Sequence, residues 1–536
     1  MNREEREQIL KDISGELKEY MEYLKEMKEE GIPGVVSSLE TEVSPGQYED
    51  REFPAFYQME GVKEILDNKR MLIADEMGVG KTAQAVAAKP AIEDKENQRV
   101  RSLIISPDYV KDHWEREINR YLEDEQKIVR IDSYENEDIW ESEDADFTLV
   151  NYHAFGNPDT RDRLTDFFLQ NDFNYLVLDE THNVKNPKAL RSSRIKTISD
   201  NSEYLCMLSG TPIPDTLKDT FNLIAMLEPD NYEDAEDVRK RHWDDPRIIR
   251  NVLNRKRVRR NLDDVTDVPP IQTNLDGNGG TIELAEEQRK LYDAVLKNDS
   301  LEGPKKLREL RYALLDPKLV DPDAVPDSNI RSKLGEMTST KYERLDEIVE
   351  EVSDRDEKVV VYSPHRVADV TEKLEDRYGE YGSLRIDGRV QPMERRMDRV
   401  KEFKENDDNH VLIATPATAG EGISLVEASN VVFLDEPYSP GEREQLLSRV
   451  RRRGQDKPVE VTSLSVKDSI DEGVLELLDK KQKAIDFMES GKELSSEDRE
   501  LLSRGGGRPV RERMYTPQQK IRIYSSRMFG VGHDKI

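Results

Sequence analysis

The sequence predicts an α/β protein built on two parallel sheets in tandem. Short apolar runs alternate with helix-like stretches along most of the 536 residues, and they fall into two sets. The first set lies at 71–73, 103–105, 147–150, 175–178 and 205–208, and the second at 359–362, 383–386, 411–414, 431–434 and 459–461. Continuous apolar runs of this length are typical of parallel strands that are buried on both faces. A proline- and glycine-rich region separates the sets, so we expect two lobes.

Composition narrows the class of protein. The length suits two to four domains, and the net charge of −31 indicates either a solvated acidic surface or adaptation to a salty cytoplasm. Any nucleic-acid contact must therefore come from local basic patches. A single cysteine, Cys206, excludes an internal disulfide framework and cysteine-rich zinc sites. The sequence shows no signal region and no apolar run of membrane-spanning length, so we expect a cytoplasmic protein without a membrane partner.

The chain is expected to divide into five segments. These are an amphipathic N-terminal helix with its linker (1–49), a first ATPase lobe (50–267), a helical inter-lobe segment (268–345), a second lobe (346–490) and a basic tail (491–536). The N-terminal helix could pack on the first lobe or on a protein partner. Residues 503–536 carry eight Lys/Arg against two Asp/Glu, so the tail either binds DNA or docks on the second lobe.

A phosphate-binding loop follows the first apolar run and precedes a helix-like stretch. It reads Asp75, Glu76, Met77, Gly78, Val79, Gly80, Lys81 and Thr82. Backbone N–H groups from Gly78 to Gly80 would close around the phosphates, Lys81 would reach the β- and γ-phosphates, and the Thr82 hydroxyl would bind Mg²⁺. Asp75 stands where the general pattern has its first glycine. A strand, a glycine loop, Lys-Thr and a helix in this order predict a nucleotide site.

Two acidic residues follow the run at 175–178, about 100 residues after the loop. A carboxylate at the end of a buried strand suits a Mg²⁺ held beside phosphates, and Asp179 fits this role. Glu180 would polarise the attacking water as a general base.

Two arginines are candidates for charge stabilisation in the transition state. Arg449 and Arg452 are three residues apart in the segment 445–455, so we expect them on one helix face, with Arg451 pointing away from it. If that face were turned toward the first lobe, both guanidinium groups could reach the γ-phosphate.

In their order, these motifs resemble those of the Swi/Snf-type ATPases, a DNA-translocating branch of helicase superfamily two. The segments 75–82, 179–182, 208–212 and 445–455 are similar to the family's phosphate loop, acidic motif, coupling motif and arginine-finger motif. Ser448 replaces the family's glycine, and Arg451 stands where histidine is common. The resemblance covers roughly residues 50–485, and the compact spacing between the lobes is similar to the annealing-helicase branch.

The resemblance implies two RecA-like lobes that bind ATP and Mg²⁺ and step along double-stranded DNA. Gln58 would read the adenine, Asp75 would belong to the nucleotide loop, and Gly422 would lie in a further nucleotide-contacting motif. Arg449 and Arg452 would be arginine fingers, and the strand end at 105–107 would meet DNA phosphate. The implied activity is that of a DNA-dependent ATPase that remodels protein–DNA complexes or forks without processive unwinding.

Two rival functions share this architecture. One is a factor that recycles stalled RNA polymerase, which would need extra polymerase-binding domains. The other is the motor subunit of a restriction-like or phage-defence complex, with specificity supplied by a partner at the N-terminal helix. The sequence has no apparent zinc module or aromatic cage for reading histones, which favours a prokaryotic or viral source. Pull-down with co-encoded proteins would separate these rivals.

Overall fold

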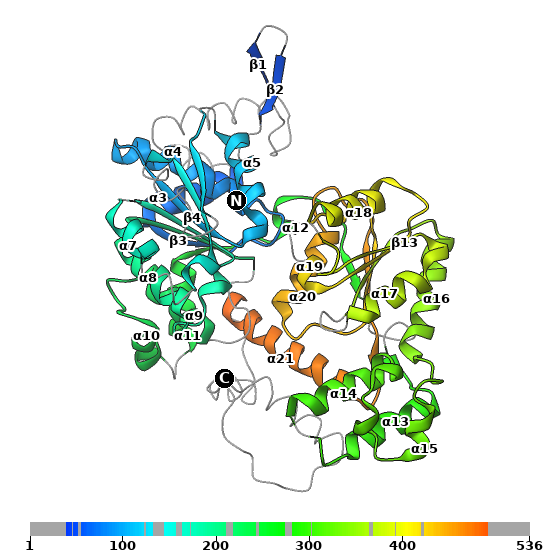
Figure 1. Ribbon diagram of the computed structural model, residues 1–536. Coiled ribbons are helices and arrows are strands. Elements are labelled where there is room, and N and C mark those ends of the chain that lie inside the picture. Colours follow the sequence, from blue (N-terminus) through cyan, green and yellow to red (C-terminus); the bar gives the residue numbers. More distant parts are fainter. Residues whose placement is uncertain are drawn as a thin grey trace. The chain divides into compact units, whose positions relative to one another are not determined.

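The structure is a computed structural model of two units, Met1–Thr266 and Asp267–Ile536 (Figure 1). It describes residues 39–44, 47–51, 55–122, 125–131, 144–156, 163–171, 173–210, 218–242, 246–273, 281–301, 303–363, 368–391, 393–419 and 423–490. The predicted N-terminal helix, the basic tail, Gly422 and Thr211 lie outside these residues. The five-segment division of the sequence stays a prediction.

The first unit is built on a seven-stranded sheet whose paired strands are all parallel. In spatial order the strands are β5 (Ile128–Ile131), β6 (Phe147–Asn151), β4 (Ser102–Ser106), β7 (Tyr175–Asp179), β8 (Tyr204–Leu208), β3 (Arg70–Ile73) and β9 (Arg257–Val258). All five expected strands are present, so the predicted fold class is confirmed for this unit. The two edge strands were not expected, because β5 is only half-buried and β9 has two residues inside a basic run.

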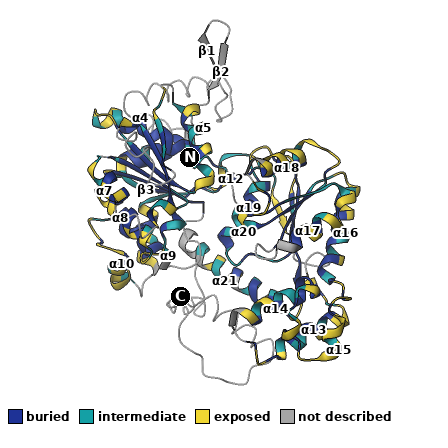
Figure 2. Cartoon of the chain, viewed as in Figure 1, coloured by how far each residue is buried: buried dark blue, intermediate teal, exposed yellow. Residues whose placement is uncertain are grey.

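Helices cover this sheet, and its centre is apolar. The helices are α3 (Phe56–Asn68), α4 (Lys81–Glu96), α5 (Lys111–Tyr121), α7 (Arg163–Gln170), α8 (Leu190–Asn201), α9 (Lys218–Leu227), α10 (Ala235–His242), α11 (Pro246–Arg255) and α12 (Leu262–Val265). Figure 2 shows the strands as a buried layer, with exposed residues on the outer sides of the helices. Trp114, Tyr175 and Tyr204 are among the largest fully buried side chains, and Cys206 is buried in the same apolar core.

The register of the sheet brings three strand ends together. Leu208 at the end of β8 pairs with Ile73 of β3 on one side and with Asp179 of β7 on the other. Because the strands are parallel, the loops that follow all three leave from the same edge of the sheet. The phosphate loop, the pair Asp179–Glu180 and Ser209–Gly210 are therefore neighbours, although more than 120 residues separate the first from the last.

The second unit contains a six-stranded sheet, again with parallel pairs throughout. Its order is β10 (Ile271–Thr273), β16 (Val459–Ser463), β15 (Asn430–Phe433), β12 (Val359–Tyr362), β14 (Val411–Ala414) and β13 (Ser383–Ile386). The five expected strands are present, and β10 adds an edge that the sequence did not suggest because its three residues are exposed.

The helices of the second unit are α13 (Glu286–Lys297), α14 (Gly303–Leu315), α15 (Ser328–Lys333), α16 (Thr340–Asp354), α17 (Ala368–Arg377), α18 (Met393–Glu405), α19 (Pro416–Ala419), α20 (Pro440–Val450) and α21 (Ile470–Ser490). Apolar residues of α13 and α14 share one core cluster with β12 and β14. The helical segment after residue 280 is thus packed into the second unit.

A fully buried lysine joins four parts of the second unit. The Nζ of Lys341 on α16 donates to the Leu434 carbonyl (2.9 Å) and lies 2.7 Å from Asp435 and 2.9 Å from Asp471 at the start of α21. Arg311 on α14 approaches the second oxygen of Asp435 at 2.9 Å. Two carboxylates and two cations therefore neutralise one another at this junction, which lies immediately before the segment leading into α20.

Two short strand pairings lie outside the two main sheets. β1 (Leu39–Ser44) and β2 (Gln47–Arg51) form an antiparallel pair where we expected only a polar linker, and β11 (Thr281–Ile282) pairs in parallel with β17 (Ser465–Val466). Within the described ranges, no helix has the length and apolar character needed to cross a membrane.

Candidate nucleotide-binding site

The phosphate loop connects β3 to α4, and glycine is required at its end. Gly78 and Gly80 have φ angles of 85° and 87°, which side-chain-bearing residues rarely adopt. A Cβ on Gly80 would lie 2.1 Å from Gln58 Nε2, so the Gln58 side chain would have to leave its contacts with the loop to admit a larger residue. Gly80 is the N-cap of α4, and the free N–H groups of a helix N-terminus bind phosphate well.

Lys81 begins α4 and folds back over the loop. Its Nζ donates to the carbonyl oxygens of Asp75 at 3.0 Å and Glu76 at 3.4 Å. Lys81 and Thr82 are both half-buried at the head of the helix. An ammonium group held by carbonyl oxygens at this place can exchange them for the oxygens of a phosphate.

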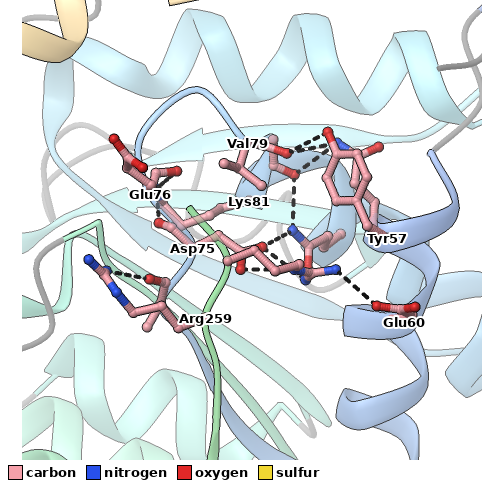
Figure 3. A network of polar contacts seen from close by, with 12 residues as sticks. Tyr57, Glu60, Asp75, Glu76, Val79, Lys81 and Arg259 are labelled. Atoms are coloured by element: carbon pink, nitrogen blue, oxygen red, sulfur yellow. Dashed lines mark hydrogen bonds and ion pairs between the residues drawn. The ribbon is translucent and has the colours of Figure 1, made fainter. Parts of the chain in front are cut away.

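Asp75 is fully buried behind the loop and takes part in a network of polar side chains (Figure 3). Arg260 approaches both oxygens of its carboxylate, with Nε 3.1 Å from Oδ1 and Nη2 2.9 Å from Oδ2. The Gln84 amide of α4 donates to Oδ2 at 2.7 Å and accepts from Arg260 at 2.9 Å. We therefore infer that Asp75 supports the loop from behind instead of touching the nucleotide. The glycine of the general pattern could not make these contacts.

Gln58 on α3 contacts the loop through its side-chain amide. Its Nε2 donates to the Val79 carbonyl at 3.2 Å, and its Oε1 accepts from the N–H of Ala55 at 2.7 Å. The Tyr57 hydroxyl donates to the same carbonyl at 3.1 Å (Figure 3). The expected contact of Gln58 with adenine stays a prediction. The observed role of Gln58 is to fix the position of the loop.

Asp179 and Glu180 lie at the end of β7, across β8 from the loop. Trp114 Nε1 donates to Asp179 Oδ2 at 2.9 Å, and the N–H of Glu180 donates to Oδ1 at 2.9 Å. Glu180 has a left-handed backbone (φ 52°, ψ 63°), which is costly for a residue with a side chain and is common at functional sites. His182 Nδ1 lies 3.3 Å from Glu180 Oε2.

These residues fit a Mg²⁺ ion that is shared with a nucleotide. Burial, together with the charge of Glu180, raises the pKa of Asp179 to about 6, so a cation beside Asp179 would favour its ionised form. No group of three or more His, Cys, Asp or Glu side chains among the described residues could hold a metal by itself. Mg²⁺ is commonly bound by one or two protein oxygens together with water and substrate phosphates. Here the Thr82 hydroxyl and the Asp179 carboxylate would supply the protein oxygens.

The turn after β8, which begins with Ser209 and Gly210, also lies beside the phosphate loop. A Cβ on Gly210 would lie 2.8 Å from Met77 Cγ and 3.5 Å from Lys81 Nζ. Arg259 Nη1 donates to the carbonyls of Ala74 at 2.8 Å and Gly210 at 3.0 Å, so one guanidinium ties this turn to the phosphate loop.

The two candidate arginines of the second unit do not share a helix face, and this prediction was wrong. α20 ends at Val450, and Arg451 already has extended backbone angles (φ −86°, ψ 93°). Arg449 is therefore in the last helical turn, whereas Arg452 lies in the segment that follows. The helix ends here because Gln455 Nε2 bonds the Val450 carbonyl at 3.2 Å and Leu425 N–H bonds that of Arg449 at 2.7 Å.

Arg451, which we expected only to point away from that face, makes a structural contact of its own. It is buried, and its Nε donates to the Pro269 carbonyl at 3.0 Å, at the entry to β10. Arg453 is exposed and is the better comparison for Arg452.

Sequence reasoning missed the side chains that support the site. Arg259 and Arg260 lie in the basic run 255–260, and Trp114 lies in a largely polar segment, and neither position marks them as part of the site. Their charge and aromatic character were visible, but their partners are far away in the sequence. Only the fold could identify those partners.

The comparisons with known proteins agree with this geometry. Residues 57–317 match the model of the SNF2-related domain, and residues 340–454 match that of the helicase conserved C-terminal domain. The chain belongs to the SNF2 family. Its SNF2-related domain includes the phosphate loop, Asp179 and Glu180, and its helicase C-terminal domain includes Arg449 and Arg452.

Among the relatives of this SNF2-family chain is the ISWI chromatin-remodeling complex ATPase ISW1 of Saccharomyces cerevisiae, 26% identical over 80% of this chain and 40% of its own length. The chromodomain-helicase-DNA-binding protein 1-like of Mus musculus is 26% identical over 78% of this chain and 48% of its length. The chain thus spans less than half the length of these relatives. A solved structure, the Sulfolobus solfataricus SWI2/SNF2 ATPase core in complex with dsDNA, is 23% identical, with 88% of this chain and 96% of that chain covered and a TM-score of 0.38.

Proposed function

We propose that this SNF2-family chain is a DNA-dependent ATPase that moves along double-stranded DNA and remodels protein–DNA complexes or forks without processive unwinding. The observation that carries the proposal is the meeting of the phosphate loop with Asp179 and Glu180 at one edge of the first sheet. The two family models, and relatives whose names describe chromatin remodelling, support the motor class.

In this proposal each residue has a specific task. Gly78, Val79, Gly80 and Lys81 bind the phosphates of ATP, and Thr82 and Asp179 hold Mg²⁺, which neutralises phosphate charge. Glu180 takes a proton from the attacking water. Arg449 and Arg452 stabilise the charge that develops on the γ-phosphate, as the arginine-finger motif implies. We further propose a cytoplasmic location in a prokaryotic or viral setting.

The test is the steady-state ATPase rate of the chain with duplex, single-stranded and forked DNA and with RNA, at low and at molar salt. We expect stimulation by duplex DNA and displacement of a third strand from a triplex, without separation of the duplex strands. Robust unwinding of a tailed duplex, or stimulation by RNA alone, would contradict the proposal. A rate that peaks at molar salt would identify the acidic surface as an adaptation to salt.

A further inference from the structure

Three contacts fix Asp179, and one of them is made by the side chain of Trp114. Trp114 lies on α5, the helix that follows the end of β4, and its side chain is fully buried. Its indole Nε1 donates to Asp179 Oδ2 at 2.9 Å. The N–H of Glu180 occupies Oδ1, and the Tyr152 hydroxyl donates to the backbone carbonyl of Asp179 at 2.6 Å.

These contacts determine how the carboxylate is turned. A carboxylate offers about four lone-pair positions, and one on each oxygen is already used. The orientation of the remaining positions is then set by the indole and by the backbone. A carboxylate that is held before its ligand arrives loses less conformational freedom on binding, which strengthens the binding of a cation.

Core packing alone does not explain the tryptophan. A buried indole N–H needs an acceptor, and a backbone carbonyl would satisfy it as well as a carboxylate does. Ile118, one helical turn further along α5, is equally buried in the same apolar cluster, and its side chain carries no polar group. An aromatic ring at position 114 would fill the core, but only the N–H reaches Asp179.

We propose that Trp114 is a positioning residue for the divalent cation: its indole N–H orients the Asp179 carboxylate that binds Mg²⁺ together with a nucleotide. The proposal rests on the proposed function, because it needs a metal–nucleotide complex at the loop. Residues that orient metal ligands from behind typically change metal affinity by 10–100-fold when they are replaced.

The experiment measures the dissociation constant of ADP by calorimetry, once with Mg²⁺ and once with EDTA. Trp114→Phe keeps an aromatic ring and removes the N–H. We expect it to weaken binding of ADP with Mg²⁺ by about 10-fold or more, with binding in EDTA changed less than about twofold. Ile118→Val is the matched control for a small change in the same core, and it should alter neither constant.

A second measurement leaves Trp114 in place. The chain has three tryptophans, so Trp140→Phe combined with Trp243→Phe makes Trp114 the single fluorophore. Its emission should change when ADP and Mg²⁺ are added and should stay constant with ADP in EDTA.

The outcomes separate the two proposals. If the wild-type chain binds ADP more tightly with Mg²⁺, but Trp114→Phe shows the same ratio of constants, the role of Trp114 is rejected and the nucleotide site stands. If the fluorescence emission of Trp114 with ADP is the same with and without Mg²⁺, the proposed role of Trp114 is also rejected. If Mg²⁺ has no effect on the wild-type chain, the metal site itself is rejected, and the inference is rejected with it.

Discussion

Arg260 holds Asp75 with two hydrogen bonds, of 3.1 and 2.9 Å, although 185 residues separate them in the sequence. The carboxylate is fully buried, and only 12% of the Arg260 side chain is exposed. Their contact joins the start of the phosphate loop to the last residues before α12. The loop is therefore fixed from behind by the segment with which the first unit ends.

Breaking this pair should destabilise the first unit. Arg260→Ala leaves a buried carboxylate without its cation, a change that typically costs about 3–5 kcal/mol in the free energy of unfolding. Asp75→Ala should cost a similar amount, and the double variant less than the sum, which urea unfolding of all three would reveal. Arg239→Ala removes an exposed pair with Glu236 and should have little effect. Equal stability of Arg239→Ala and Arg260→Ala would contradict the prediction.

Lys81→Ala and Glu180→Gln should both abolish ATP turnover, but for different reasons. Lys81→Ala removes charge at the phosphates and should also weaken nucleotide binding. Glu180→Gln keeps the phosphate and metal contacts, so we expect it to bind ATP while turnover falls by about 10²–10⁴-fold. ATPase assays and calorimetry with a non-hydrolysable nucleotide measure the two effects. A Glu180→Gln chain with near wild-type turnover would show that another group is the base.

Arg452→Ala should lower ATP turnover by about 10³-fold or more, the usual effect of losing an arginine finger, with little change in nucleotide affinity. Arg453→Ala is the control, because Arg453 is the exposed neighbour in the same segment. Arg451→Ala is unsuitable as a control, since it removes a buried contact with Pro269. Similar turnover in the Arg452 and Arg453 variants would remove Arg452 from the catalytic residues.

Asp179 should make stability depend on pH. Burial raises the pKa of Asp179 from its ordinary 3.8 to about 6, so the folded chain binds this proton more tightly than the unfolded chain. The resulting stability is fully present below about pH 4 and is lost as the pH rises through about 6. Without nucleotide or metal, the wild type should gain about 1 kcal/mol relative to Asp179→Asn between pH 7 and pH 5. Chemical denaturation at both values measures it, and a constant difference would refute the shift.

Lys341→Met should destabilise the second unit by about 3–5 kcal/mol, because it leaves the carboxylates of Asp435 and Asp471, only 4% and 13% exposed, with too little positive charge. Lys290→Met, which removes an exposed pair with Glu286, is the comparison and should leave the unfolding transition unchanged. Denaturant unfolding followed by a probe in the second unit would measure both. A Lys341→Met chain as stable as the Lys290→Met chain would mean that solvent reaches this junction.

The sequence by itself determined most of the strands and the order of the site motifs. Ten short runs were enough to locate ten strands, and most of them are apolar because both faces of the strand are buried. β13 is an exception, since most of its residues are half-buried and it contains Ser383 and Arg385. The phosphate loop could also be found locally, since its glycines, Lys81 and Thr82 act through backbone conformation and direct contact with phosphate. Asp179 and Glu180 were identifiable for the same reason, as they directly follow a buried strand.

The tertiary structure alone decided which distant residues support these motifs. Asp75 meets Arg260 and Trp114 meets Asp179 only because parallel pairing brings separate strand ends to one edge, and no local pattern encodes those pairings. The end of α20 at Val450 could not be predicted either, because the spacing of Arg449 and Arg452, three residues apart, is compatible with a helix that continues to Arg452. Side chains and backbone from elsewhere in the second unit bond the last carbonyls of that helix, and these contacts outweigh the local preference.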